Sequence, residues 1–233
     1  MAITSYAVEK STEQRGHRGI QFHLAGGTIL SEPTPYGLMP VSSGEELLRR
    51  YAPEIVGDAC VTQLKQMDST DMHFEDYKKV AESIVGGVRN GHKSHIVVQG
   101  TDTMPYGAAF LSLRLPFKDY HVGIVGSMYP IGEGSDALCN LRAAFAAAEQ
   151  GWPGTYVIMN NGEVLRASRA VKTRANKVFR GEIVPEVHSF QSLHYPVLAR
   201  LSDGSVEYTR RGKSAQKRFL KRKERDDFLR TSL

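Results

Sequence analysis

Short apolar segments that end in glycine alternate along this chain with stretches of helical periodicity, and this alternation constrains the fold more than any other feature. Residues 95–98 are typical, because they are followed by Gly100-Thr101-Asp102-Thr103, where polar side chains abruptly replace apolar ones. An apolar segment of this length that is bounded by a glycine is typical of a buried parallel strand. The alternation of such strands with helices predicts an α/β fold, an open and mostly parallel sheet with helices on both faces.

The same patterns predict where the elements lie. Strands are expected at residues 19–25, 58–65, 95–98, 121–125 and 155–159, and helices at residues 44–51, 74–88, 106–115 and 136–148. Asp71 and Ser135 are expected to cap two of these helices, because short polar side chains accept hydrogen bonds from the free N–H groups there. Residues 31–43 predict a Pro/Gly/Ser-rich loop that is long enough to act as a lid. Residues 195–201 and 205–209 predict a β-hairpin around Asp203-Gly204.

Positive charge is concentrated near the carboxyl end. Residues 210–230 contain ten Lys or Arg against three Asp or Glu, a local balance of +7 that exceeds the net +5 of the whole chain. The preceding body is therefore close to neutral, which argues against a basic surface over the whole molecule. We expect residues 1–209 to form one domain with a flexible lead-in at residues 1–16, and residues 210–233 to form a basic tail, helical or disordered.

The composition excludes several classes of protein. No apolar segment is long enough to span a bilayer, and residues 1–16 lack the apolar core of a signal peptide. Cys60 and Cys139 are the only cysteines, and neither lies in a CxxC or zinc-ligand spacing. The sequence therefore predicts a cytoplasmic protein with reduced thiols, without membrane contact, metal or cofactor.

Polar residues follow the carboxyl ends of the predicted strands, where ligands bind in open α/β sheets. These residues are Thr28, Ser69, Asp71, Thr101, Asp102 and Ser127. Most carry hydroxyls and none is histidine, which favours a nucleophilic hydroxyl that is activated by a lysine. Taken singly, Ser69, Asp71 or Thr103 is more typical of a helix cap. Thr28 differs, because it follows two glycines and a cap does not require both of them.

Other catalytic motifs are absent from the sequence. It contains no GxxxxGK[ST] phosphate loop, no GxGxxG after the first strand and no GxSxG nucleophile elbow. His92 and His95 form an isolated HxxH, a pattern more typical of surface histidines than of metal ligands. The strand-end hydroxyls therefore remain the best candidates for chemistry.

Five segments together resemble the amino-terminal, catalytic domain of bacterial-type L-asparaginases and glutaminases. The two signatures are Gly26-Gly27-Thr28-Ile29 and Gly100-Thr101-Asp102-Thr103-Met104, and the segments at residues 68–72, 126–130 and 169–172 occur in matching order. The resemblance covers residues 19–172, and residues 190–208 resemble the end of that domain. It implies a Rossmann-like fold, residues 1–209 as a catalytic domain, and hydrolysis of the side-chain amide of asparagine, or of glutamine, without a cofactor.

The resemblance also implies a role for each matching residue. Thr28 would attack the amide carbon and form an acyl-enzyme, while Thr101, Asp102 and Lys172 would form a hydrogen-bonded group that activates the nucleophile or water. Ser69 and Asp102 would hold the substrate's α-carboxylate and α-ammonium groups. The other positions implied for substrate binding are Gly27, Gly100, Thr70 and Ser127. Tyr36, in the predicted lid, could stand where the family has a loop tyrosine that polarises the threonine.

The sequence departs from the family's pattern at three places. Gln99 stands where many members have histidine, and the long separation of Lys172 from Phe190 predicts an insertion at residues 177–188. Nothing resembles the family's carboxyl-terminal domain, so a single-domain short form is expected. The resemblance further implies a homodimer or higher homo-oligomer.

Two other functions compete with an amidohydrolase of asparagine. The first is a module that binds aspartate or asparagine with little turnover. The second is a component of an amidotransferase, in which the tail at residues 210–230 binds RNA or an acidic partner through phosphate or carboxylate contacts. A solvated tail without any partner is the simpler interpretation, because only Phe219 and Phe228 are placed to stack on bases.

Overall fold

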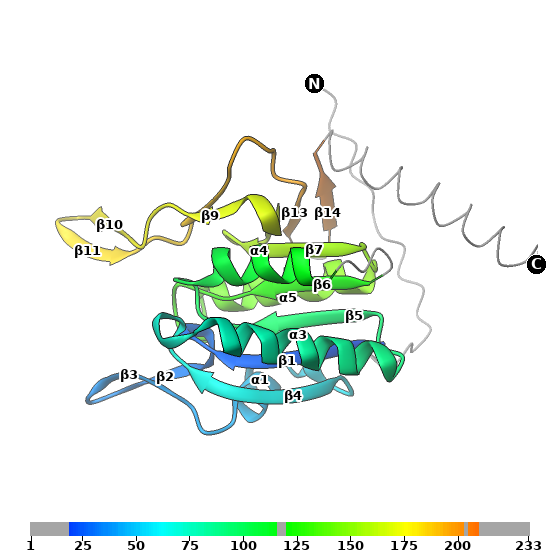
Figure 1. The fold of residues 1–233 in the computed structure, drawn as a ribbon. Coiled ribbons are helices and arrows are strands. Elements are labelled where there is room, and N and C mark those ends of the chain that lie inside the picture. Colours follow the sequence, from blue (N-terminus) through cyan, green and yellow to red (C-terminus); the bar gives the residue numbers. More distant parts are fainter. Residues whose placement is uncertain (1–18, 116–119, 203–204, 210–233) are drawn as a thin grey trace, which may run out of the picture.

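In the computed structural model, which describes residues 19–115, 120–202 and 205–209, the chain is organised around one mixed sheet (Figure 1). Eight strands of the described chain form it, in the order β14-β13-β8-β7-β6-β5-β1-β4. Their bounds are Ile20–Gly26 (β1), Cys60–Met67 (β4), Ser94–Val98 (β5), His121–Val125 (β6), Gly154–Met159 (β7), Glu163–Arg166 (β8), Ala199–Ser202 (β13) and Ser205–Tyr208 (β14). The strands β4, β1, β5, β6 and β7 run parallel to one another. The pairs β7–β8, β8–β13 and β13–β14 are antiparallel. The predicted mostly parallel sheet is confirmed.

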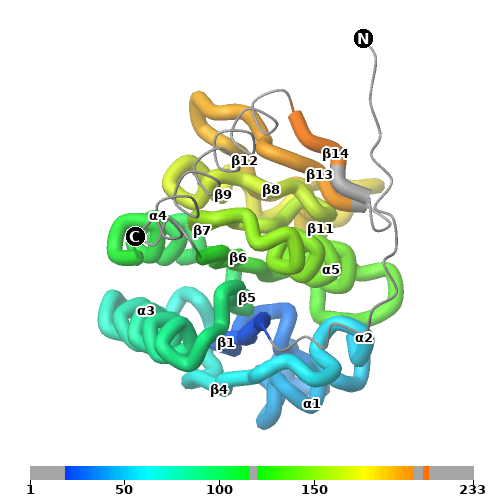
Figure 2. Tube along the Cα trace, turned by 90° about the vertical axis from the view of Figure 1, so that its right-hand side faces the viewer, coloured from blue at the N-terminus to red at the C-terminus, as the bar shows by residue number. Residues whose placement is uncertain are grey.

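Helices cover both faces of this sheet (Figure 2). α1 (Gly44–Tyr51), α2 (Pro53–Val56) and α5 (Asp136–Glu149) lie on one face, and α3 (Phe74–Arg89) and α4 (Met104–Arg114) lie on the other. Because successive side chains of a strand point to opposite faces, Ile96 packs in the first core and Val97 in the second. Both side chains are fully buried, as expected for a strand covered on two sides.

The predicted elements are all present, and most of their boundaries lie within two residues of the prediction. The exception is the strand expected at residues 195–201, which begins only at Ala199. The cap at Ser135 is confirmed, because its hydroxyl accepts a hydrogen bond from the Ala137 N–H at 3.2 Å. The cap at Asp71 is wrong. Asp71 ends a 3-10 turn, and α3 begins later, where the Asp76 carboxylate accepts from the His73 N–H at 3.0 Å.

Residues 31–43, which were expected to form a loop, instead contain a β-hairpin, so that prediction is wrong. β2 (Ser31–Thr34) and β3 (Gly37–Pro40) pair antiparallel, and the Thr34 hydroxyl closes the turn by donating to the Gly37 carbonyl at 2.8 Å. Gly37 has a φ of 108°, which glycine adopts without the steric cost of a side chain. The hairpin projects from the edge of the sheet at which the parallel strands end (Figure 1).

A second hairpin, β10 (Asn176–Phe179) and β11 (Glu182–Pro185), overlaps the insertion predicted at residues 177–188 and projects from the same edge (Figure 1). Arg180 and Gly181 both have positive φ, as a two-residue hairpin turn requires. The chain enters this hairpin from β9 (Ala170–Lys172) and returns in β12 (Phe190–Ser192), which pairs with β9. The excursion therefore leaves Lys172 directly opposite Phe190.

The predicted carboxyl-terminal hairpin is confirmed by the pairing of β13 with β14, although its turn at residues 203–204 lies outside the described residues. The lead-in at residues 1–16 and the tail at residues 210–233 also lie outside them. Among the described helices, none has the length and apolar character needed to cross a bilayer. The expectation that His95 is a surface residue is wrong, because its side chain is fully buried in β5.

Candidate active site

The strand order places a topological switch point beside β1. From β1 the chain adds β4 on one side and then β5, β6 and β7 on the other. In open α/β sheets, ligands bind at such a point in a crevice outside the carboxyl ends of the strands, here where the loops after β1 and β5 lie. Thr28 follows β1, and Thr101 and Asp102 follow β5, so the fold brings the predicted residues to this crevice.

Glycines allow the three strand-end loops to touch through their backbones. Gly27 has a φ of 88°, and a Cβ there would lie 2.2 Å from the Gly100 nitrogen. A Cβ on Gly100 would in turn lie 2.7 Å from the Ser69 hydroxyl oxygen. No larger residue fits at either contact, so the glycines hold the loops of Thr28, Ser69 and Thr101 against one another.

Thr28 opens a short 3-10 turn whose next two residues, Ile29 and Leu30, are fully buried. These two side chains anchor the turn in the core beneath α1. Thr28 itself is partly exposed, and its hydroxyl hydrogen-bonds to no group within the described residues. The Thr28 hydroxyl is therefore carried on a turn that is anchored in the core, and no hydrogen bond within the described residues has to be broken before it meets a ligand.

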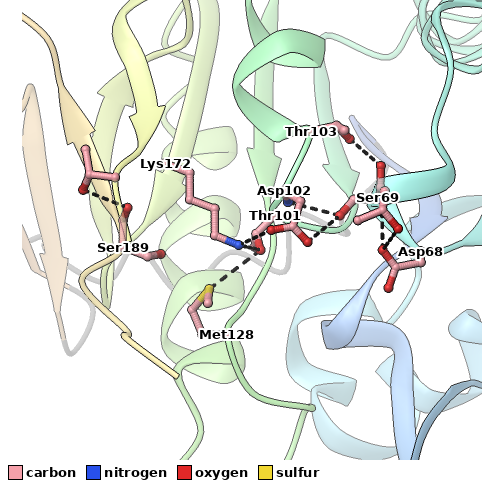
Figure 3. Close-up of polar contacts among 10 residues, drawn as sticks. Asp68, Ser69, Thr101, Asp102, Thr103, Met128, Lys172 and Ser189 are labelled. Carbon is pink, nitrogen blue, oxygen red and sulfur yellow. Dashed lines mark hydrogen bonds and ion pairs between the residues drawn. The ribbon is translucent and has the colours of Figure 1, made fainter. Parts of the chain in front are cut away.

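Lys172 joins this cluster from the other side of the crevice. Its Nζ donates to the Thr101 hydroxyl at 2.8 Å and to the Asp102 carboxylate at 2.6 Å (Figure 3). The Lys172 side chain is 11% exposed, whereas the Asp102 side chain is 50% exposed. The cation is thus enclosed, while its carboxylate partner is half exposed to solvent. The Thr101 hydroxyl also lies 3.7 Å from the Met128 sulfur.

Ser69 ties the loop after β4 to Asp102. Its hydroxyl accepts from the Asp102 N–H at 3.1 Å and lies 3.5 Å from the Asp102 carboxylate (Figure 3). Thr70 is not part of this contact, because its N–H and its hydroxyl both donate to Asp68, each at 2.9 Å. Of the two hydroxyls in this loop, only that of Ser69 is brought to Asp102.

Thr103 occupies the N-cap position of α4, but its side chain does not cap the helix, so that prediction is wrong. Its hydroxyl donates to the Ser69 carbonyl at 2.8 Å and accepts from the Tyr77 hydroxyl at 2.7 Å. Tyr77, on the buried face of α3, was not singled out from the sequence. A tyrosine on such a face is itself a signal, because a buried phenol needs a hydrogen-bond partner. Burial raises the pKa of Tyr77, so the phenol stays protonated and able to donate.

The loop after β6 packs against Thr101 through Met128. The Asp136 carboxylate accepts from the N–H groups of Met128 and Tyr129 at 2.9 and 3.1 Å. Burial raises the pKa of Asp136, and the two N–H bonds partly oppose that shift. Ser127 is 1% exposed, and its hydroxyl donates to the Tyr129 carbonyl. The side chain that this loop presents to Thr101 is therefore Met128, which sequence reasoning did not single out.

Tyr36 lies apart from these residues. It occupies the tip of the β2–β3 hairpin, where the residue is 94% exposed, and its N–H donates to the Thr34 hydroxyl at 3.2 Å. In the part of the chain that the structure describes, no three His, Cys, Asp or Glu side chains lie together so that they could hold a metal ion. The cluster instead offers hydroxyls, one ammonium and one carboxylate. Such a set can bind a zwitterion and polarise a hydroxyl nucleophile.

The chain is similar in sequence to known proteins over most of its length. Residues 20–213 match the family of the asparaginase N-terminal domain. L-asparaginase of Thermococcus kodakarensis is 29% identical over 189 residues, which cover 78% of this chain and 53% of that protein. The D subunit of glutamyl-tRNA(Gln) amidotransferase from the same organism is 31% identical over 194 residues, which cover 79% of this chain and 42% of that protein.

The fold is also similar to those of solved structures. The crystal structure of the probable cytoplasmic L-asparaginase from Campylobacter jejuni superposes with a TM-score of 0.68 at 26% identity. The superposition covers 82% of this chain and 58% of that one. The chain spans about half the length of the curated relatives that it matches, 53% and 42% of the two described above.

Proposed function

The chain belongs to the asparaginase family, and from this premise we propose that it hydrolyses the side-chain amide of L-asparagine to aspartate and ammonia through an acyl-enzyme on Thr28. The observation that carries the proposal is the convergence of Lys172 on Thr101 and Asp102, at 2.8 and 2.6 Å, beside the Thr28 turn. A structural ion pair would need only the carboxylate, whereas here the ammonium also donates to a hydroxyl.

The first half of the reaction forms an ester. The Thr28 oxygen adds to the amide carbon, its proton passes through the Thr101 hydroxyl to the amide nitrogen, and the C–N bond breaks to release ammonia. The Lys172 ammonium, which donates to the Thr101 oxygen, lowers the cost of negative charge on that oxygen during the transfer. In the second half, water adds to the ester carbon, the C–O bond breaks, and Thr28 recovers its proton.

The substrate is held by its two charged groups. The exposed side of Asp102 accepts the α-ammonium, and the Ser69 hydroxyl turns its proton to the α-carboxylate. The contact between Ser69 and the Asp102 carboxylate supports this assignment, because at 3.5 Å it is long and easily exchanged for a ligand. Glutamine differs from asparagine by one methylene, which a pocket discriminates by only about 1–3 kcal/mol, so both amides belong in the test.

The test is a coupled ammonia assay on asparagine and glutamine, with calorimetric titration of free aspartate as ligand. Ammonia release by the wild type and its loss in Thr28→Ala are expected. Undiminished turnover by Thr28→Ala would overturn the nucleophile. Binding of aspartate without ammonia release would favour a binding module.

Further parts of the proposal concern the whole protein. We assign residues 1–209 to the catalytic domain, and we propose that the protein assembles as a homodimer or higher homo-oligomer in the cytoplasm. The half-exposed Asp102 supports assembly, since a second surface could cover the crevice. The similarity to a protein from Campylobacter jejuni that is named a probable cytoplasmic L-asparaginase supports the compartment. Light scattering of the purified chain tests the oligomeric state.

A second function is an amidotransferase component that acts on charged tRNA. It is favoured by the similarity to the D subunit of glutamyl-tRNA(Gln) amidotransferase and by the ten basic residues at positions 210–230. Binding of tRNA through phosphate contacts should weaken steeply as salt rises. Equal tRNA retention by the full chain and by a chain ending at Thr209 would dispose of a role for the tail.

A further inference from the structure

A chain of hydrogen bonds reaches the site from α3. The Tyr77 hydroxyl donates to the Thr103 hydroxyl at 2.7 Å, and the Thr103 hydroxyl donates to the Ser69 carbonyl at 2.8 Å (Figure 3 shows the second bond). Tyr77 also approaches the Thr103 carbonyl at 3.0 Å. The three residues come from α3, from the start of α4 and from the loop after β4. The chain of bonds therefore links the two loops that carry Ser69 and Asp102.

The Tyr77 ring cannot easily move. It is 5% exposed and lies against Gly107 of α4, where a Cβ would come within 2.0 Å of the ring. Glycine in a helix interior costs about 1 kcal/mol relative to alanine, so its presence at this contact indicates that the ring requires the space. The phenol is thus fixed by packing, and its position determines where the Thr103 hydroxyl can be.

We propose that Tyr77 is a positioning residue: through the Thr103 hydroxyl it holds Ser69 at a fixed distance from Asp102, and so sets how well a zwitterionic substrate is bound. The inference rests on the proposed function, in which Ser69 and Asp102 bind the α-carboxylate and the α-ammonium. Those two groups are a fixed distance apart in any α-amino acid. A site that binds both the α-carboxylate and the α-ammonium therefore gains affinity only while the spacing between Ser69 and Asp102 is maintained.

The direction of the hydrogen bonds strengthens this inference. Tyr77 remains a donor because burial raises the pKa of its phenol. Its proton occupies the Thr103 oxygen, which leaves the Thr103 proton directed at the Ser69 carbonyl. Such chains polarise one another, so loss of the first bond weakens the second. Neither Tyr77 nor Thr103 needs to touch the substrate.

The experiment measures KM and kcat for asparagine in Tyr77→Phe and Thr103→Val. Loss of one neutral hydrogen bond should raise KM about 3- to 10-fold, with kcat changed less than about twofold. The KM of the double variant should be no higher than that of the poorer single variant, because both substitutions interrupt the same series of hydrogen bonds. Thr103→Ser keeps the hydroxyl and should retain the KM of the wild type.

Tyr156→Phe is the matched control. Tyr156 lies in β7, and its hydroxyl donates to the Pro153 carbonyl at 2.7 Å, at the opposite end of the strand from the crevice. Loss of this hydroxyl should lower Tm without changing KM. If Tyr77→Phe lowers Tm to a similar extent and leaves KM within twofold of the wild type, Tyr77 has only a structural role and the inference fails.

Failure of the proposed function would look different. Suppose that the wild type released no ammonia and bound no aspartate. The positioning of Ser69 by Tyr77 and Thr103 could then still be tested by amide hydrogen exchange. The N–H of Asp102 donates to the Ser69 hydroxyl and the N–H of Met72 to the Ser69 carbonyl, at 3.1 and 3.2 Å. Both amides should exchange at least about threefold faster in Tyr77→Phe than in Tyr156→Phe. Equal rates in the two variants would contradict the positioning role.

Discussion

Lys172 lies 2.6 Å from the Asp102 carboxylate although seventy residues separate them in the chain. The contact depends on the pairing of β9 with β12, which holds Lys172 opposite the buried Phe190. The β10–β11 hairpin, which lies between these two strands in the sequence, projects outward and therefore does not disturb the pairing of β9 with β12. A short strand pair thus delivers the cation to the crevice from outside the main sheet.

Lys172→Met tests the importance of this cation. The variant keeps the length of the side chain, and the half-exposed Asp102 is solvated by water when its partner is lost, so the fold should survive. Loss of proton-transfer support at Thr101 should lower kcat/KM about 100- to 10,000-fold. Activity and circular dichroism are measured together. Lys177→Met, which breaks a lysine–glutamate pair in the hairpin region, is the control and should keep its activity.

Gly27→Ala tests the backbone contact between strand-end loops. At a φ of 88°, with the Gly100 nitrogen 2.2 Å from the new Cβ, the substitution forces the Thr28 and Thr101 loops apart. We expect a loss of at least about 2 kcal/mol in unfolding free energy, together with loss of activity. Gly86→Ala is the control, because a Cβ there meets nothing within 4 Å and the residue lies inside α3. It should stabilise the protein by about 0.5–1 kcal/mol in urea unfolding.

The sequence predicted the sheet and the strand-end loops because both depend on local patterns. Apolar segments that end in glycine mark where parallel strands stop, and Gly27 and Gly100 proved to be the points at which the loops touch. The convergence of Lys172 on Thr101 could be expected only through the family resemblance. Nothing in the local pattern around residues 170–172 reports the pairing that places it.

What the sequence could not give were contacts that depend on tertiary partners. Thr103 has the residue type and position of a cap, yet its hydroxyl is used by Ser69 and Tyr77. His95 carries a polar ring that periodicity cannot assign to a core, but the His23 ring lies within hydrogen-bond distance of it, at 3.1 Å. In each case the competing partner is remote in sequence, so residue type alone favoured the commoner local arrangement.

Asp136→Asn tests the support of the loop after β6. The carboxylate accepts from two N–H groups, whereas an amide offers one oxygen and turns its own N–H toward a donor. We expect a loss of about 1–3 kcal/mol in stability, and a lower kcat because Met128 packs on Thr101. Glu133→Gln, an exposed carboxylate in the same loop, should change neither Tm nor kcat. An unchanged Tm in Asp136→Asn would contradict the supporting role.

Acid should destabilise the protein through its buried histidines. Burial lowers the pKa of His23 from 6.5 to about 3 and the pKa of His95 and His121 from 6.5 to about 4, and a neighbouring histidine adds to each shift. Below pH 6.5 these histidines are therefore protonated in the unfolded chain but remain neutral in the folded chain. Stability is greatest above pH 6.5 and falls as the pH drops toward 4, by about 1.4 kcal/mol per pH unit for each such group.

Urea unfolding at pH 7.5, 6.0 and 5.0 measures that slope. His121→Gln keeps a donor for the Trp152 carbonyl, which His121 Nδ1 contacts at 2.9 Å, and removes one titrating ring. Between pH 6.0 and 5.0 its slope should be shallower by the contribution of one group, about 1 kcal/mol per pH unit. His194→Asn replaces an exposed histidine at a positive φ that asparagine tolerates, and it should leave the slope of the wild type unchanged. Stability that stayed constant between pH 7.5 and 5.0 would mean that water reaches these rings in the folded state.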